Sequence, residues 1–382
     1  MFETSVDLCI VGAGYAAVNA LNAASHHLSS GARVAVIARE NEWGGQWVGQ
    51  YDFVRLHQPY KGFSAGGREW DLNVKDSHLA NKREILRHFE GIVESCRKEK
   101  DLDLAAFFQY ECGEPSLVQR GSSEKTVRVI AHKLSKANGN IYPQIVCVFA
   151  KKLIRATGFD ISVKIPGVFS TASNKVISLA PNDVLTPEWN LKMRFSSDGK
   201  RLNRAPIYVV GSGKTSMDVI YHLSKKLKGI EGRLNCISGR GTWFMNRDEL
   251  NPTNDKNFWK RNIYGYNTPL DYIQKMFTMY DGTNAKEVYN EMAKSGFLHT
   301  AVPGAENFMV GVSSSEEIAT VKQALSPPKD KIIRAYLIDI VDKENDSTGG
   351  LQLKLSSVDG KRVFYKDLEP GAFVVNCTAH VG

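Results

Sequence analysis

The sequence of 382 residues lacks the features of several common protein classes. None of its six cysteines form a CxxC pair, and their spacing fits neither a zinc site nor a disulfide framework. We therefore predict no metal site and reduced, mostly buried thiols. No apolar run reaches the roughly 18 residues of a membrane span. The N-terminus has no basic segment followed by a cleavage site, and we expect a cytoplasmic protein.

The charge balance is moderately basic, with 49 basic and 41 acidic residues and a formal net charge of +8. This excess favours an anionic partner, and a dinucleotide satisfies it as well as nucleic acid does. No dense Lys/Arg tract with interleaved aromatic residues occurs, so we expect no nucleic-acid binding. Domains usually hold about 100–200 residues, so the length predicts two of them. The sequence leaves homo-oligomer formation open.

What the sequence does contain is a loose internal repeat. In the first copy, an apolar strand at residues 6–11 runs into Gly12 and Gly14, and a small-residue helix and a strand at 33–38 follow. In the second copy, a strand at 206–210 runs into Gly211 and Gly213, a helix extends to about residue 227, and a strand spans 233–238. Strand, glycine turn, helix and strand form one parallel βαβ unit.

Each copy is followed by a β-meander, predicted at 127–131 and 145–149 in the first half and at 332–341 and 351–355 in the second. Between them, residues 81–99 predict an amphipathic helix with a capping box of Asn81 and Glu84. The predicted fold is α/β, with two Rossmann-like dinucleotide-binding domains, each with a β-meander. We assign residues 1–160 and 330–382 to the first dinucleotide-binding domain. Residues 161–329 form the second, with a helical insertion around 251–325.

The first glycine turn has the residues that a dinucleotide needs. Gly12 allows a tight turn, Gly14 lets a pyrophosphate approach the backbone, and the small Ala17 lets the helix pack closely on the strand. The pyrophosphate would lie at the helix N-terminus, where free N–H groups favour negative charge. Arg39 and Glu40 follow the second strand, and Glu40 is the candidate for binding the ribose hydroxyls. A glycine turn without a ligand, and a solvated Glu40, are the alternatives.

Gly211, Gly213 and Ser216 repeat this pattern, with Lys214 beside them. A nucleoside triphosphate loop would need glycine where Tyr208 stands, so that interpretation is rejected.

Ser238, Arg240 and Arg247 follow the next strand, and no acidic residue ends it. An arginine there can hold a 2′-phosphate, because the guanidinium fork matches phosphate oxygens. Both observations favour NADPH over NADH. A plain surface arginine is the alternative.

Three segments resemble the flavin-containing monooxygenase family, the class B flavoprotein monooxygenases that include Baeyer–Villiger and N-hydroxylating enzymes. They are Gly44-Gly45-Gln46-Trp47, the segment at residues 51–57, and the segment at residues 239–243. The segments that end in Thr157-Gly158 and Thr378 are similar to the family pattern as well. Residues 165–173, between the two domains, lack the Gly and the His of the family's linker motif.

The resemblance implies a monooxygenase that uses O₂, with FAD in the first domain (1–160 and 330–382) and NADPH in the second (161–329). NADPH would reduce the flavin, and a C4a-peroxyflavin would transfer one oxygen atom to a small organic substrate by N-, S- or carbonyl-adjacent oxidation. It implies cofactor contacts at Gly45, Gln46, Trp47, Thr157, Gly158 and Thr378. The catalytic candidates near the flavin are Arg55, His57 and Gln58.

Two other functions remain open. One is an NAD(P)H-dependent flavoprotein reductase or oxidase that does not oxygenate. The missing CxxC pair excludes its dithiol–disulfide branch. The other is a non-enzymatic protein that binds flavin or nucleotide. The fold alone does not decide among the three functions.

Overall fold

The computed structural model describes residues 1–120, 124–134, 144–158, 166–172, 174–195, 202–227, 230, 232–250, 269–327, 331–344 and 349–378. The chain divides into two compact units, which we call unit 1 (through residue 161) and unit 2 (from residue 162 onward). Each is described by itself.

Unit 1 is built on one mixed sheet in the order β3-β2-β1-β7-β6-β4, with β5 paired to β6. Four neighbouring strands, β3, β2, β1 and β7, are parallel. The strand β6 pairs antiparallel with β7, β4 and β5. The strands are β1 (Phe2–Val11), β2 (Arg33–Ala38), β3 (Asp103–Phe108), β4 (Tyr110–Cys112), β5 (Ser116–Arg120), β6 (Glu124–Lys133) and β7 (Ile145–Arg155).

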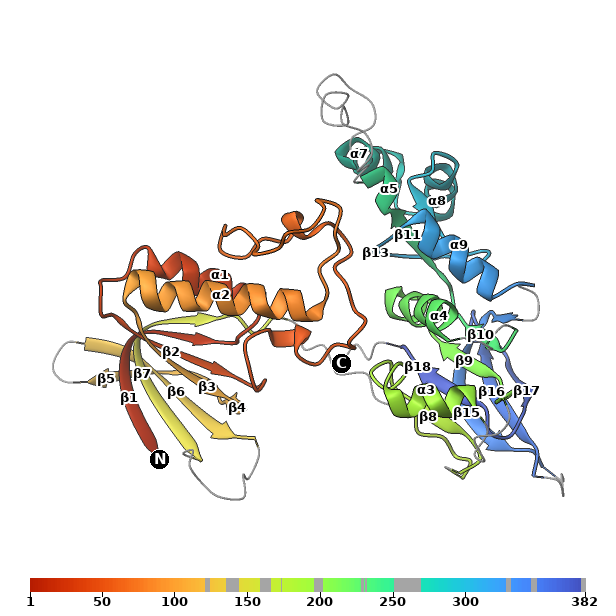
Figure 1. Ribbon diagram of the computed structural model, residues 1–382, viewed down its shortest axis with the longest axis horizontal. Coiled ribbons are helices and arrows are strands. Elements are labelled where there is room, and N and C mark those ends of the chain that lie inside the picture. The colour runs from red at the N-terminus through yellow and green to blue at the C-terminus, as the bar shows by residue number, and fades with distance from the viewer. Residues whose placement is uncertain are drawn as a thin grey trace. The chain divides into compact units, whose positions relative to one another are not determined.

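Both faces of this sheet are covered, which explains the continuous apolar runs of β1 and β2. Leu8 and Ile10 of β1 join the core beneath the helices, whereas Cys9 and Val11 join the core on the opposite face. The helices α1 (Tyr15–Ser25) and α2 (Lys82–Lys100) pack on each other along one face (Figure 1). Two short 3₁₀ helices, η1 (Gly45–Trp47) and η2 (Tyr60–Gly62), lie in the connection between β2 and α2.

The amphipathic helix predicted at 81–99 is confirmed as α2. Asn81 caps it and forms the predicted capping box with Glu84. Its predicted apolar face is fully buried, and it consists of Ile85, Phe89, Ile92 and Cys96.

Unit 2 is built on a parallel sheet in the order β14-β10-β9-β18-β8. The strands are β8 (Ile177–Leu179), β9 (Ile207–Val210), β10 (Leu234–Ile237), β14 (Ile332–Ile333) and β18 (Phe373–Asn376). Helices α3 (Pro187–Arg194) and α4 (Lys214–Lys226) belong to this unit (Figure 1). The α/β fold with two Rossmann-like parallel sheets is thereby confirmed.

Both β-meanders are confirmed. In unit 1, β5, β6 and β7 follow one another antiparallel. In unit 2, β15 (Ala335–Asp342), β16 (Leu351–Ser357) and β17 (Val363–Leu368) form a separate antiparallel sheet. Leu351, Leu353 and Leu355 of β16 pack into the core shared with β9 and β10. The connection between β6 and β7, at residues 135–143, lies outside the described residues.

The assignment of residues 330–382 to the first domain is wrong. The strands β14 and β18 complete the sheet of unit 2, where Phe373 pairs with both Ile207 and Ile177. The physical reason is burial, because Phe373, Val374 and Val375 are fully buried between β9 and β8. The last residues, 379–382, lie outside the described part of the chain.

The insertion expected to be helical is mixed. It contains the helices α7 (Pro269–Met279), α8 (Ala285–Lys294) and α9 (Ser315–Ala324). It also contains β12 (Leu298–His299) and β13 (Asn307–Ser313), which flank β11 (Thr242–Asn246) in a three-stranded sheet. The short helix α5 (Arg247–Leu250) directly follows β11. The buried Phe297, Leu298 and Val312 give these strands a core of their own. Residues 251–268 lie outside the described part.

Candidate functional site

The glycine turn of unit 1 joins the end of β1 to the start of α1. Gly12 has φ +115°, and a Cβ placed on it would lie 2.4 Å from the backbone oxygen of Ala156. The Gly12 N–H donates to the Ile37 oxygen of β2 at 2.8 Å. Gly14 is the N-cap of α1, and no side chain caps that end. Glycine at position 12 is therefore required by both conformation and space.

A second loop lies directly against this turn. Gly45 has φ +56°, and a Cβ on it would lie 2.6 Å from the Cα of Gly14. The Gly44 N–H donates to the Ala13 oxygen at 2.9 Å. The double glycine of the Gly-Gly-x-Trp segment thus allows two backbones to touch at the N-terminus of α1. Gln46 is exposed there.

Aromatic side chains pack beside the same helix end. Phe63 stacks on Tyr15, the first residue of α1, with a 4.6 Å centroid distance. Trp47 meets the Phe63 ring edge-on at 6.0 Å, and Trp47 is half-buried. Trp47 therefore packs beside the N-terminus of α1 through Phe63. Ala17, on α1, is fully buried, as a close contact between the helix and the strand requires.

The other residues predicted for FAD lie at the same carboxyl edge of the sheet. Arg39 and Glu40 directly follow β2, and Glu40 is half-buried, with its backbone oxygen accepting the Gln109 N–H at 2.8 Å. Thr157 and Gly158 follow β7 and are exposed. They come directly after Ala156, whose backbone leaves no room for a side chain at Gly12. The structure therefore brings these predicted residues to one edge.

The three catalytic candidates lie on the segment that precedes α2. Arg55 is exposed, and its guanidinium donates to the Leu79 oxygen at 3.2 Å. Gln58 is exposed too, and its amide donates to the Gly62 oxygen at 3.0 Å. His57 is half-buried between them in sequence. Gln58 contacts a residue within its own loop, whereas Arg55 contacts a residue 24 positions along the chain. Neither contact tests catalysis, so the catalytic roles stay predictions.

Unit 2 repeats the glycine turn between β9 and α4. Gly211 has φ +112°, and a Cβ on it would lie 2.9 Å from Ser216 Oγ and 3.3 Å from the Cys377 oxygen. Ser216 is fully buried at the helix–strand contact, the place that Ala17 has in unit 1. Gly213 is the N-cap of α4, and no described residue lies within 4 Å of a Cβ placed on it. Among the described residues, this turn is therefore open above the helix end.

The ends of the neighbouring strands line this second turn. Ser212 Oγ donates to the Ser238 oxygen at 2.8 Å, which fixes the turn to the end of β10. Thr378 is exposed after β18, and its hydroxyl donates to Asn376 at 2.6 Å. Ser238 directly follows β10 and is itself buried.

The two glycine-turn helices differ from the other α-helices of the described chain in their N-termini. The helices α2, α3 and α9 are capped by the side chains of Asn81, Thr186 and Ser314. The helices α5, α7 and α8 carry an acidic residue in the first turn. Only α1 and α4 have neither. Their N–H groups are therefore available to an anion.

The three cations predicted for the second cofactor lie in different surroundings. Arg240 is exposed in the turn after β10, and its guanidinium has no partner among the described residues. Lys214 and Arg247, in contrast, are nearly buried and both contact Glu317 of α9. The structure thus brings Lys214 and Arg247 together through a carboxylate that the sequence interpretation missed.

Glu317 is held at the N-terminus of α9. Its carboxylate accepts the Ser314 N–H at 2.7 Å, and Ser314 Oγ accepts the Glu317 N–H at 3.1 Å. Burial by itself would raise the pKa of Glu317, but Lys214 and Arg247 outweigh it and the pKa is lowered. The Ser-x-x-Glu spacing from 314 to 317 is a capping-box signal that could have located this residue.

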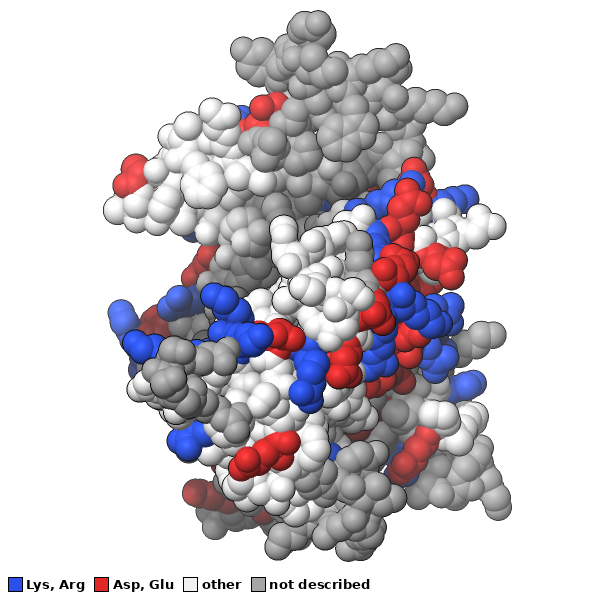
Figure 2. Space-filling view, turned by 90° about the vertical axis from the view of Figure 1, so that its left-hand side faces the viewer, with Lys and Arg blue, Asp and Glu red and all other residues white. Residues whose placement is uncertain are grey.

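Among the coloured residues on the right of Figure 2, Lys and Arg side chains lie next to Asp and Glu side chains. A cavity of about 370 Å³ lies in unit 1 between residues 68–72 and α2. None of the predicted site residues line it. No helix of the described chain is both long and apolar enough to cross a membrane, and no described cluster of His, Cys, Asp or Glu could hold a metal.

Several solved monooxygenases share the fold of this chain. A cadaverine monooxygenase from Erwinia amylovora, bound to FAD, matches 99% of this chain and 79% of its own with a TM-score of 0.54 and 13% identity. An ornithine N-hydroxylase from Kutzneria sp. 744 matches 98% of this chain and 81% of its own (TM-score 0.53, 12% identity). A polycyclic ketone monooxygenase from Thermothelomyces thermophila matches 100% and 64% (TM-score 0.53, 17% identity). The chain has the fold of these monooxygenases.

In sequence, the chain is 27% identical over 232 residues to uncharacterised proteins of Mycobacterium tuberculosis and Mycobacterium bovis. The match covers 58% of this chain and 37% of those relatives, so it spans little more than a third of their length. No protein-family model matches the chain.

Proposed function

We propose that this protein is an FAD- and NADPH-dependent monooxygenase that transfers one oxygen atom from O₂ to a small organic molecule. The observation that carries the proposal is the pair of glycine turns. Each leads from the carboxyl end of an inner parallel strand to a helix with an uncapped N-terminus. The fold shared with the monooxygenases that oxidise cadaverine, ornithine and polycyclic ketones supports it.

Unit 1 is the proposed FAD-binding unit. The uncapped α1 would receive the pyrophosphate beside Gly14, and Glu40 at the end of β2 would accept the ribose hydroxyls. Thr157 and Gly158, exposed beside the turn, would line the same edge. A pyrophosphate fits because nothing on α1 neutralises its N-terminal N–H groups: the N-cap is glycine and the first turn has no acidic residue.

Unit 2 is the proposed NADPH-binding unit. Gly211 and Gly213 repeat the turn, and the space above Gly213 is open to a phosphate. Arg240 is exposed in the turn after β10, and in the proposed complex its guanidinium would lie beside the adenosine ribose and bind the 2′-phosphate. No acidic residue immediately follows β10, where a carboxylate would instead bind the ribose of NADH.

When bound, FAD would supply hydride acceptance and oxygen activation, and the chain would bind, orient and shield it. Arg55, His57 and Gln58 are the proposed groups that donate hydrogen bonds near the flavin ring. A nitrogen, a sulfur or a carbonyl-adjacent carbon is the proposed site of oxidation.

The first experiment is an absorbance spectrum of the purified protein, followed by anaerobic NADPH and then air. A flavin band that bleaches with NADPH, and a transient absorbing species after air that precedes the oxidised spectrum, would support the monooxygenase. An immediate return to oxidised flavin would favour a reductase or oxidase. Tight flavin with very slow NADPH oxidation would favour a non-enzymatic binding protein. Absence of a flavin band after added FAD would refute the proposal.

A matched pair of variants tests which unit binds which cofactor. Gly14→Val places a branched side chain at the α1 end, where a Cβ already lies 3.5 Å from Gly45 Cα, and we expect colourless protein. Gly213→Val alters the equivalent position of unit 2, and we expect yellow protein that NADPH no longer bleaches. A colourless Gly213→Val together with a yellow Gly14→Val would reverse the assignment.

A further inference from the structure

Four charged side chains form a nearly buried network beside the glycine turn of unit 2. Lys214 of α4 contacts Asp218 one turn along the same helix, and its Nζ lies 3.3 Å from Glu317 Oε1. Arg247 Nη2 lies 3.0 Å from Glu317 Oε2. The four side chains are between 11% and 20% exposed, so water screens them poorly.

Two cations and two carboxylates make this network formally neutral. Burial by itself would lower the pKa of Lys214, but Asp218 and Glu317 outweigh it and the pKa is raised, so the ammonium group stays charged. Glu317 in turn stays ionised between its two cations. Removing one carboxylate would therefore leave an uncompensated positive charge beside the turn.

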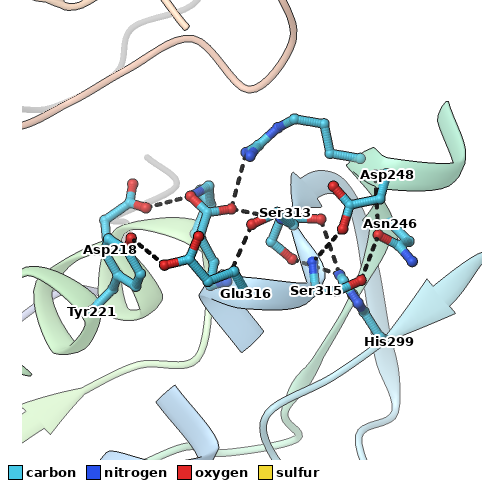
Figure 3. A network of polar contacts seen from close by, with 12 residues as sticks. Asp218, Tyr221, Asn246, Asp248, His299, Ser313, Ser315 and Glu316 are labelled. Carbon is cyan, nitrogen blue, oxygen red and sulfur yellow. Dashed lines mark hydrogen bonds and ion pairs between the residues drawn. The ribbon is translucent and has the colours of Figure 1, made fainter. Parts of the chain in front are cut away.

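The network also joins two parts of unit 2. Glu317 is on α9, at the end of the insertion, and Lys214 is the first residue of α4. On the exposed side of the same contact, Glu316 accepts a hydrogen bond from Tyr221 of α4 (Figure 3). Glu316 also pairs with Lys225 of α4. Glu316 is 70% exposed, which makes it a natural control for Glu317 on the next residue of the helix.

We propose that Glu317 sets the nucleotide preference of unit 2: it neutralises Lys214 and Arg247 and leaves Arg240 as the cation that binds a 2′-phosphate. This inference rests on the proposed function, in which unit 2 binds a nicotinamide dinucleotide. It reassigns both cations from phosphate binding to holding α9 in place, Lys214 from α4 and Arg247 from α5. The preference for a nucleotide with a 2′-phosphate is then smaller than it would be if Arg240, Lys214 and Arg247 all bound that phosphate.

The test uses two nucleotides that differ only in the 2′-phosphate, namely 2′,5′-ADP and 5′-AMP, titrated into the full chain by calorimetry. The measured quantity is the ratio of their dissociation constants. Glu317→Gln leaves one uncompensated cation nearby, so we expect the ratio to shift toward 2′,5′-ADP by about threefold to tenfold. Glu316→Gln, whose carboxylate is solvated, should leave it unchanged.

The double variant Glu317→Gln/Arg247→Gln separates the two roles of Arg247 and protects the test against misfolding of the single variant. It removes one charge of each sign and keeps the network neutral. If Arg247 only balances Glu317, the ratio returns to that of the unchanged protein. A ratio well below that value would show that Arg247 contacts the phosphate itself and would overturn the inference.

The remaining outcomes distinguish the inference from the function on which it rests. If Glu317→Gln keeps its circular dichroism spectrum and its ratio is unchanged, the inference is wrong and the cofactor site stands. If the unchanged protein binds neither 2′,5′-ADP nor 5′-AMP, the nucleotide site of unit 2 is wrong, and both proposals fail.

Discussion

The two units carry the same turn in different surroundings. In both, the first glycine has a φ near +115° and lies against the backbone that follows a neighbouring parallel strand, Ala156 in unit 1 and Cys377 in unit 2. Above the second glycine they diverge. The backbone of Gly45 touches Gly14, whereas Gly213 has open space. The strand–turn–helix geometry is thus set locally, and the neighbouring loops set what can approach it.

The units also bury ionisable groups in different ways. Unit 1 buries His88 of α2 as a neutral ring, stacked on Trp70 at 4.0 Å and accepting the Ala65 N–H. Unit 2 buries charges in compensating pairs around Glu317. A neutral ring avoids desolvating a charge, whereas paired charges depend on a partner from a distant segment.

The largest expected effect comes from breaking the turns themselves. Gly12→Ala meets a rigid backbone oxygen at 2.4 Å, and Gly211→Ala meets a hydroxyl at 2.9 Å that can rotate away. Both residues also need a positive φ that alanine adopts at a cost. We expect Gly12→Ala to lower the free energy of unfolding by about 3 kcal/mol or more, and Gly211→Ala by less.

Urea unfolding followed by circular dichroism measures both variants. Gly213→Ala is the control, because its φ is −75° and its Cβ would meet nothing, and it should cost about 1 kcal/mol or less. If Gly12→Ala and Gly213→Ala lost the same free energy of unfolding, the steric clash between a Cβ at position 12 and the Ala156 backbone would not distinguish the two turns.

The next effect tests the neutral ring of unit 1 by pH. Burial lowers the pKa of His88 from 6.5 to about 4. Between these values the unfolded chain binds a proton that the folded chain does not, so the stabilisation is complete above pH 6.5 and is lost as the pH falls toward 4. The loss amounts to roughly 3 kcal/mol.

Denaturation curves at several pH values measure this loss. His88→Gln should flatten the dependence between pH 6.5 and 4, whereas His27→Gln, at an exposed position, should leave it in place. A dependence in His88→Gln as steep as in the unchanged protein would assign the acid sensitivity to other groups.

The smallest effect tests the open turn of unit 2. A charge-assisted contact contributes about 1.5–3 kcal/mol, so Arg240→Ala should raise KM for NADPH roughly tenfold or more and leave KM for NADH nearly unchanged. Steady-state kinetics with both cofactors measure this. Arg334→Ala is a useful comparison, because Arg334 is already bound to Glu306. An equal rise of both KM values in Arg240→Ala would remove its role in recognising the 2′-phosphate.

Much of each unit could be predicted from local pattern. The strand at 33–38 has the predicted bounds, and the helix predicted at 81–99 lies at Lys82–Lys100 with its capping box. Short-range signals of this kind depend on neighbours within a few residues. The strands β12 and β13 were missed because β12 is two residues long and β13 is interrupted by a register shift, so neither shows a clear alternation.

The grouping of the last strands could not be predicted in the same way. An apolar strand such as β18 fits any parallel sheet, and only its burial between β9 and β8 assigns it to unit 2. The same holds for Lys214, whose sequence context beside Gly213 indicates a phosphate ligand. Its contact with Glu317 joins residues 103 positions apart.

The sequence by itself determined the two glycine turns, the helices that follow them and the small residues beneath them, because steric limits on φ and close helix–strand contact act between near neighbours. Only the tertiary structure decided which strands complete each sheet and which cations are already neutralised. Those outcomes depend on long-range packing and on distances between charges, which the order of residues along the chain does not contain.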